Sequence, residues 1–193
     1  MDSFEYLTVF VSIILGLGMT YLILGIGKLL SQKKHIRFYW IHHIQIVSTF
    51  LIILNTWWLT YSWVGIETLT FLHYLFLMCT PLVVVLASSF LFPGGMMKNT
   101  SLKEHYFSIY KPYYILVSLI WPFDIVDTLL KGTYRFTELG APYVLISSLS
   151  FSIVLSPVFI RKPLYHGFVQ IYIIASLIIS KFLFAPTLES LIR

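Results

Sequence analysis

A small set of ionisable and amide side chains lies within segments that are otherwise apolar, and these side chains could do chemistry there. The set consists of Glu5, Asn55, His73, Asp124, Asp127 and Lys181. A charged group that stayed unpaired at the centre of a bilayer would cost about 2.5–3.5 kcal/mol. Such groups therefore pair with one another or line a polar cavity, and we treat the set as one intramembrane cluster.

Asp124 and Asp127 are spaced i, i+3, so they share one face of a helix. Counted from the start of its own span, each of Asp124 and Lys181 lies at a depth of about 20 Å. These matched depths predict an ion pair between Lys181 and Asp124 or Asp127, facing the interior of a helix bundle. If the span ends near Pro122 instead, both aspartates lie at the membrane interface near Lys131.

The intramembrane cluster has two interpretations. Polar groups that converge at one depth could line a water-filled cavity or pore. They could equally satisfy one another across helix interfaces, as polar residues in membrane bundles commonly do. Both interpretations stay open at the level of the sequence.

A second set of candidate residues lies in and beside basic segments, on the predicted cytoplasmic face. Its members are Arg37, His42, His43, Glu104 and His105. Histidine titrates near neutral pH and binds metals, so this set could handle protons. We predict no metal site, because adjacent histidines point about 100° apart on a helix and the i, i+4 spacing of a helical metal pair is absent.

Arg37 and His42 also have an Arg-x4-His spacing that resembles the motif of HEPN-type ribonucleases, and Arg161 and His166 repeat it. A proline at position 163 would interrupt a helix within the second copy. Arginine and histidine are also frequent at membrane boundaries, where their polar tips reach the headgroups. The spacing therefore predicts either a catalytic pair or simple interfacial anchors.

The elements that must hold these residues are membrane helices. Of 193 residues, 58% are hydrophobic and 11% are charged, whereas about a quarter are charged in soluble domains. Apolar runs near 20 residues are long enough to cross a bilayer as helices. We predict an all-α, polytopic bundle forming a single domain over 1–193, with about six spans. These are 4–30, 39–64, 69–92, 113–130, 141–160 and 167–185, and the loop over 96–111 could contain a short interfacial helix.

The first span carries small residues on two faces. Gly16, Thr20 and Gly27 fall within about 40° of one another, and Gly18 and Gly25 lie roughly opposite. Small residues allow close approach of helix backbones, which drives association in lipid. Two opposed faces predict a helix packed between two partners, either two spans of its own chain or one span and a second subunit.

The distribution of Lys and Arg predicts the orientation. Cytoplasmic loops are enriched in these residues, and placing the N-terminus outside puts most of them in the cytoplasm. That group comprises Lys28, Lys33, Lys34, Arg37, Lys98, Lys103, Lys111, Arg161 and Lys162. The net charge of +5 is explained by this bias, so we expect no direct binding of nucleic acid, although the basic loops could bind a soluble cytoplasmic partner.

Several stretches resemble known families. The segments FEYLTVFVSIILGLGMTYLILGIGKLL, RFYWIHH, NTWWLTYSW and KEHYFSIYKPYYIL are similar to those of a widespread family of small multispanning proteins of the bacterial inner membrane. That resemblance implies packed helices and no particular reaction. General size and polarity, together with Arg37 and His42, also resemble membrane accessory proteins of RNA-targeting (type VI-B) CRISPR defence loci, some of which form oligomeric pores.

These observations lead to a non-enzymatic inner-membrane protein that self-associates, plausible as a pore or as a membrane-perturbing defence accessory. One alternative is a small transporter or proton-coupled carrier that uses the intramembrane Asp and Lys residues. The other is a membrane enzyme with a cytoplasmic His/Glu site acting on lipid or RNA. We expect no cofactor, and we expect lipid and further copies of the chain as partners.

Overall fold

Helices make up nearly all of the computed structural model, which describes residues 3–32, 36–64, 70–94 and 100–183. The long helices are α1 (Ser3–Ser31), α2 (Trp40–Thr60), α3 (Phe71–Ser89), α4 (Leu102–Ser118), α5 (Ile120–Leu130), α6 (Thr133–Leu155) and α7 (Pro163–Leu183). Two short 3-10 turns, η2 (Tyr61–Trp63) and η3 (Ser156–Val158), extend α2 and α6. The strands β1 (Ile36–Arg37) and β2 (Thr100–Ser101) form one short parallel pair.

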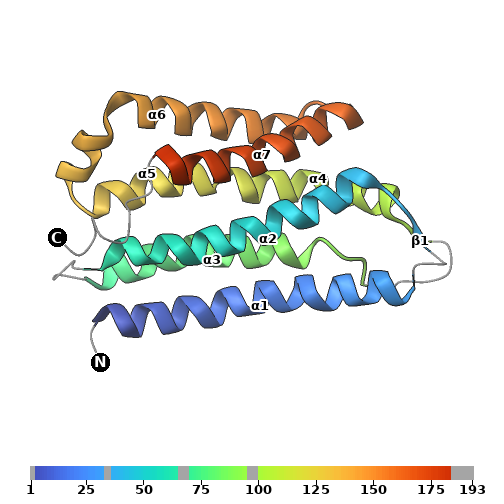
Figure 1. Ribbon diagram of the computed structural model, residues 1–193, viewed down its shortest axis with the longest axis horizontal. Coiled ribbons are helices and arrows are strands. Elements are labelled where there is room, and N and C mark those ends of the chain that lie inside the picture. Colours follow the sequence, from blue (N-terminus) through green and yellow to red (C-terminus); the bar gives the residue numbers. More distant parts are fainter. Residues whose placement is uncertain (1–2, 33–35, 65–69, 95–99, 184–193) are drawn as a thin grey trace.

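The helices lie side by side and alternate in direction (Figure 1). α2, α4 with α5, and α7 run one way, while α1, α3 and α6 run the other. α1 lies at one side of the bundle and packs on α3 and α2, whereas α2 also packs on α7. α1 therefore packs on two spans of its own chain from one side of the bundle, and α2 contacts helices on both sides of itself.

The predicted all-α membrane bundle is confirmed. Five helical segments are long and apolar enough to cross a membrane. They are Phe4–Ser31, Trp40–Trp63, Phe71–Ser89, Leu102–Leu130 and Leu139–Val158. The sixth predicted span falls on α7, whose described apolar stretch, Pro163–Ile179, is shorter. The chain therefore has the architecture of a multi-pass membrane protein.

The fourth span begins earlier than the sequence analysis places it. Residues 102–111 of the segment predicted as a loop with an interfacial helix are instead the first part of α4, which begins at Leu102. The Ser101 side chain accepts a hydrogen bond from the Glu104 backbone N–H at 3.3 Å, which caps the helix start. Pro112 lies inside the helix and does not end it, so α4 and α5 together form one long membrane segment.

The fifth span begins at a glycine kink. Gly140 has φ +67°, a left-handed conformation that is open to glycine and strained for other residues. The chain turns there, before Pro142, and the membrane segment begins at Leu139. The break separates the first turns of α6 from the long part that packs beside α7 and α5.

Candidate functional site

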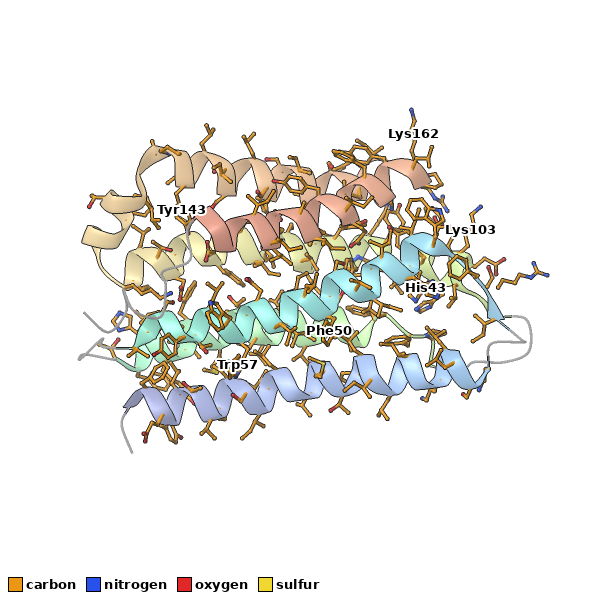
Figure 2. All side chains as sticks on the ribbon, viewed as in Figure 1. His43, Phe50, Trp57, Lys103, Tyr143 and Lys162 are labelled. Carbon is orange, nitrogen blue, oxygen red and sulfur yellow. The ribbon has the colours of Figure 1, made fainter. Side chains whose placement is uncertain are left out.

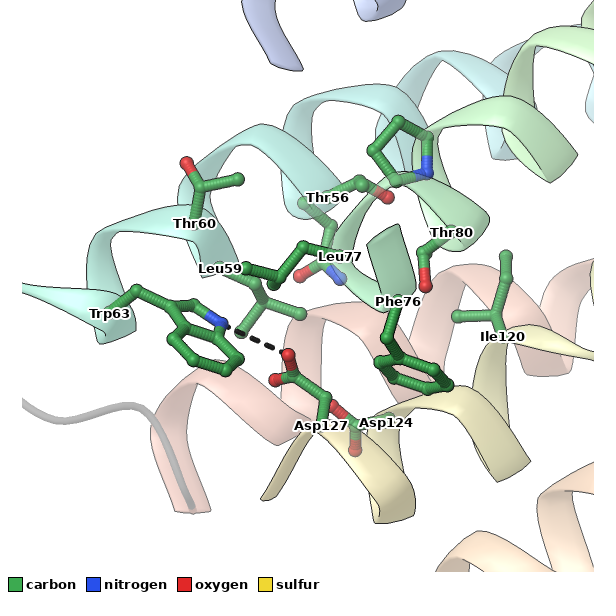
Figure 3. Close-up of a pocket in the computed structure, with 12 residues that line it drawn as sticks. Thr56, Leu59, Thr60, Trp63, Phe76, Leu77, Thr80, Ile120, Asp124 and Asp127 are labelled. Carbon is green, nitrogen blue, oxygen red and sulfur yellow. Dashed lines mark hydrogen bonds between the residues drawn. The ribbon is translucent and has the colours of Figure 1, made fainter. Parts of the chain in front are cut away.

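Asp124 and Asp127 lie on α5, at the end of the bundle where α2 passes into η2. The helix presents both carboxylates to one side, as their i, i+3 spacing predicts. The Trp63 indole N–H donates a hydrogen bond to Oδ1 of Asp127 at 3.0 Å (Figure 3). An indole has a single donor and no acceptor, so Trp63 fixes the orientation of this carboxylate from the neighbouring helix.

The described cationic partner of Asp127 is Lys131, one turn further along the chain. Their side chains form an ion pair, in which the Asp127 side chain is 20% exposed and the Lys131 side chain only 5%. The Lys131 ammonium also donates to the Ser62 hydroxyl at 2.6 Å and lies 5.2 Å from the centre of the Trp63 ring. The side chain of Lys181 lies outside the described part of the chain, so its predicted pairing stays a prediction.

Asp124 is held by the next helix. The Tyr143 hydroxyl donates to Oδ2 of Asp124 at 2.7 Å. Because that hydroxyl has one proton, the Thr128 hydroxyl, 2.9 Å away, serves as the donor to Tyr143. α6 thereby orients the second carboxylate, and the Tyr143 side chain is itself buried.

Between these carboxylates and the facing helices lies a cavity of about 60 Å³, which we call the acidic pocket (Figure 3). A cavity needs roughly 10–15 Å³ to hold one water molecule, so this pocket has room for several waters or one small solute. The pocket is lined by Asn55, Thr56, Leu59, Thr60, Trp63, Phe76, Leu77, Thr80, Pro81, Ile120, Asp124 and Asp127. Three predicted members of the intramembrane cluster therefore meet at one cavity.

The lining of the acidic pocket includes one buried side-chain oxygen without a partner and one position where a helix hydrogen bond is missing. The side-chain oxygen of Asn55 is buried and makes no hydrogen bond to any residue in the described part of the chain. Pro81 lies inside α3 and has no N–H to donate to the carbonyl of Leu77, one turn earlier. Both α3 residues line the pocket, so the lining favours a cation or a hydrogen-bond donor.

The remaining members of the predicted cluster lie elsewhere. His73 caps the start of α3, where its backbone N–H donates to Thr70 Oγ1 and its Nδ1 accepts from the Thr70 backbone N–H. Its ring lies 6.1 Å from that of Trp63, so it is a neighbour of the pocket. Glu5 is exposed on α1. The described lining of the pocket includes neither residue.

The histidines of the second predicted set meet at the opposite end of the bundle. The His42 ring is buried, with its centre 5.9 Å from that of His105 and 6.3 Å from that of His43. His105 Nε2 donates to the carbonyls of Phe90 and Leu91, both at 3.1 Å, and so caps the C-terminal end of α3. In the same way His43 Nδ1 donates to a carbonyl, that of Tyr39, at 3.0 Å.

The charged members of that set are exposed. Arg37 lies on β1 and Glu104 in the first turn of α4. Lys103 and Lys162 mark the same end (Figure 2), which we call the basic end. The structure thus brings the three histidine rings together, with His42 buried and His43 and His105 partly exposed, and leaves the arginine and glutamate at the surface.

A third polar group was missed by the sequence analysis. His166, on α7, is fully buried and is surrounded by aromatic rings of α4. Its Nε2 donates to the Ile160 carbonyl at 2.7 Å, so Nδ1 of the neutral ring accepts from the Tyr106 hydroxyl at 2.8 Å. The Tyr114 hydroxyl lies 3.1 Å from that of Tyr106.

This group continues towards the middle of α2. Gln170 donates through Nε2 to the Tyr114 hydroxyl at 3.1 Å and accepts from the Ser48 hydroxyl at 2.6 Å. The hydroxyls of Thr49 and Tyr113 are 2.8 Å apart. We call the seven side chains the tyrosine network: Ser48, Thr49, Tyr106, Tyr113, Tyr114, His166 and Gln170.

The tyrosine network had a sequence signal. Tyr106, Tyr113 and Tyr114 recur at i, i+7 and i+8, and His166 and Gln170 at i, i+4, which places each set on one helix face. The sequence analysis considered His166 only for its spacing from Arg161. That arginine is exposed and lies 5.6 Å from the centre of the Phe107 ring.

The predicted packing glycines of α1 divide into two kinds. A Cβ added at Gly18 would lie 3.4 Å from side chains of α2 and α3, and one added at Gly25 would overlap the Phe92 ring. At Gly16 and Gly27 no described atom lies within 4 Å of that position, and Thr20 on the same face is exposed. The face with Gly18 and Gly25 therefore packs against other segments of the chain, and the face with Gly16 and Gly27 points outwards from the bundle.

The described residues contain no group of three or more His, Cys, Asp or Glu side chains that could hold a metal ion. Comparisons of the chain with protein-family models, with curated proteins and with solved structures find no match.

Proposed function

We propose that this protein is a small membrane carrier for a proton or another hard monovalent cation, with the acidic pocket as its binding site. The observation that supports this proposal is the convergence of Asn55, Asp124 and Asp127 on one cavity within membrane-spanning helices. Ionisable residues are rare in such helices, and where they occur they typically mark an ion or substrate pathway.

The chemistry of the lining favours a cation. Its polar groups offer carboxylate, amide and hydroxyl oxygens, which are the ligands that hard cations prefer. The Trp63 N–H is already donated to Asp127. A solute with a positive charge or with donor groups would therefore complete the pocket.

The pocket is built by one chain. Its walls come from α2 with η2, α3 and α5, and the supporting tyrosine comes from α6. A pore assembled from several copies is thus unnecessary to shelter these carboxylates. For this reason we place the carrier ahead of the pore that the sequence alone favours.

The proposal is tested in proteoliposomes that contain a pH-sensitive dye in one preparation and a Na⁺-sensitive dye in another. An inward ion gradient should give influx of one of the two ions above the level of protein-free liposomes. Asp124→Asn should abolish most of that influx, whereas the control Glu104→Gln, exposed at the basic end, should leave it unchanged. Influx equal to that of empty liposomes for both ions, or full influx in Asp124→Asn, would contradict the proposal.

Self-association is a second candidate property, and one observation favours it. The outward face of α1 combines Gly16, Thr20 and Gly27 with no described atom near either glycine, and such faces allow close helix contact in lipid. Gly16→Leu with Gly27→Leu should lower the mass of the purified protein in detergent if this face joins two copies. If the parent protein itself has the mass of a monomer in detergent, it does not self-associate through this face, and the pore proposal fails as well.

The proposed membrane and biological context rest on the resemblance, and the proposed orientation rests on the distribution of Lys and Arg. We propose the bacterial inner membrane as the location, with the N-terminus outside and the basic end in the cytoplasm, where a soluble partner could bind. A role in antiviral defence remains a prediction of the same kind. Fusing a reporter that is active on one side only to either end of the chain would test the orientation.

A further inference from the structure

α2 carries a polar face along most of its length, and that face is buried. At 100° per residue, positions 42, 45, 49, 56 and 60 fall within about 60° of one another. They hold His42, Gln45, Thr49, Thr56 and Thr60, and all of these side chains are buried. The three threonine hydroxyls donate to carbonyls of α2 itself, so the side chains with polar atoms still to be satisfied are those of His42 and Gln45.

The two ends of this face enter two different polar regions. Thr56 and Thr60 line the acidic pocket. Thr49 belongs to the tyrosine network through its bond to Tyr113, and the network reaches His166 near the basic end. α2 therefore connects two polar regions that begin at opposite ends of the bundle.

A single apolar layer separates the two regions. Between Thr49 and Thr56 no polar residue falls on this face, and Ile52 and Ile53 lie just beyond its two edges, each 3% exposed. One turn beyond the network residues Tyr113 and Gln170, the neighbouring helices place Val117 and Ile173, which are 1% and 0% exposed. Ile52, Val117 and Ile173 each follow, by about one turn, network residues that are hydrogen-bonded to one another. Since α2, α4 and α7 run in the same direction (Figure 1), we infer that these three side chains lie at about the same level. They belong to one buried cluster.

Beside the tyrosine network lie several buried polar atoms that have no hydrogen-bond partner at good geometry among the described residues. Both ring nitrogens of His42, both amide atoms of Gln45 and the Tyr39 hydroxyl are buried and make no hydrogen bond to described residues. His42 and Gln45 are fully buried. A buried polar group left unsatisfied costs about 1–3 kcal/mol, and internal water is the usual remedy.

We propose that Ile52, Val117 and Ile173 form a hydrophobic barrier between two hydrated compartments of one proton path, the acidic pocket and the region around His42, Gln45 and the tyrosine network. Apolar constrictions block ions because water leaves them. The barrier closes the path in the conformation described. The inference rests on the proposed carrier function only for the identity of the ion.

The test introduces a hydroxyl into the barrier. Val117→Thr preserves side-chain shape, and Ile52→Thr is the second variant. Each should raise passive proton influx into dye-loaded proteoliposomes severalfold above that of the parent protein under an imposed inside-negative potential. The control is Val47→Thr, because Val47 is 51% exposed on the outer face of the same helix. It adds the same hydroxyl to α2 and should leave influx unchanged.

The outcomes separate the barrier from the carrier. If both barrier variants elute and melt like the parent and show parental influx, the barrier proposal is overturned. If the parent carries no ion but the variants leak and Val47→Thr does not, the barrier holds and the carrier fails. If all three threonine variants leak equally, a general loosening of α2 is the cause, and the barrier proposal is again overturned.

Discussion

Asp127 has two described partners, Lys131 and Trp63, and these contacts determine what its substitution will do. Lys131 neutralises it, Trp63 donates to it, and Ser62 holds Lys131 in place. An ion pair as buried as this one need not stabilise the fold, because both charges lose hydration when they are buried. Removal of one partner is different, because the other charge is then left without compensation.

Lys131→Met is therefore expected to lower the free energy of unfolding by about 3 kcal/mol, the lower end of the range for breaking a buried pair. The double variant Asp127→Asn with Lys131→Met should recover much of this loss, since no charge then remains unpaired. Thermal unfolding in detergent measures both. A double variant as unstable as the sum of the single ones would show that the two charges do not interact.

The hydrogen bonds of the tyrosine network should matter less to stability. Interhelical polar contacts in membrane proteins average about 0.6 kcal/mol. Tyr113→Phe removes one hydroxyl next to Thr49, and we expect a loss of about that size in the same assay. A loss as large as that for Lys131→Met would show that this single hydroxyl stabilises the fold as much as the charge of Lys131 does.

At the scale of helices, two glycines allow an aromatic ring of a neighbouring segment to lie directly against the helix backbone. Gly25 on α1 lies against the Phe92 ring, and Gly167 on α7 lies against the Trp40 ring of α2. A methyl group at either position would enter the aromatic ring. Gly27, half a turn from Gly25, has no described atom within 4 Å of its Cβ position.

Gly25→Ala and Gly27→Ala form a matched pair. Both replace glycine in the same helix, so both gain the same helix propensity of about 1 kcal/mol. Gly25→Ala should nevertheless be less stable than Gly27→Ala by about 1–3 kcal/mol, the usual penalty of overpacking. Equal melting temperatures would show that Phe92 moves aside freely.

The contact of α2 with α7 allows a compensation test. Gly167→Ala should destabilise the parent protein, because the added methyl group overlaps Trp40. In a Trp40→Leu background the same substitution should cost little, since the ring is gone. Additive losses in the double variant would show that the two residues are not in direct conflict.

Features that depend on residues close together in the chain could be predicted from the sequence, whereas contacts between distant segments could not. The apolar runs predict the spans because the length of a helix and its solvent are local properties. The start of α4 also has a local signal, the cap formed by Ser101 and Glu104. The predicted span nevertheless begins only at 113, directly after Pro112, because a proline commonly interrupts a helix. The proximity of Asp127 to Lys131 is likewise an i, i+4 relation that can be read from the chain.

Contacts between helices could not be predicted in the same way. The tyrosine network needs α2, α4 and α7 to be neighbours, with Ser48, Tyr113 and Gln170 at one level. No periodicity within one helix states which helix lies beside it. For the same reason the two faces of α1 could be recognised, whereas the inward one could not be told from the outward one.

At the scale of the whole molecule, the bundle places an acidic pocket near one end and a buried imidazole and hydroxyl network near the other. One helix, α2, contributes to both. The carrier proposal requires that the pocket open in turn to each side of the membrane. Thr80 lines the pocket from α3 (Figure 3), which makes it a suitable reporter of that opening.

The most direct measurement is therefore labelling of Thr80→Cys by a membrane-impermeant thiol reagent in right-side-out and in inside-out vesicles. The native Cys79 is first replaced by serine, and Lys103→Cys, exposed at the basic end, serves as the control that reacts from one side only. Our account predicts that Cys at position 80 reacts from both sides. Reaction from a single side, opposite to that of the Lys103→Cys control, would contradict a carrier and leave only a static binding pocket.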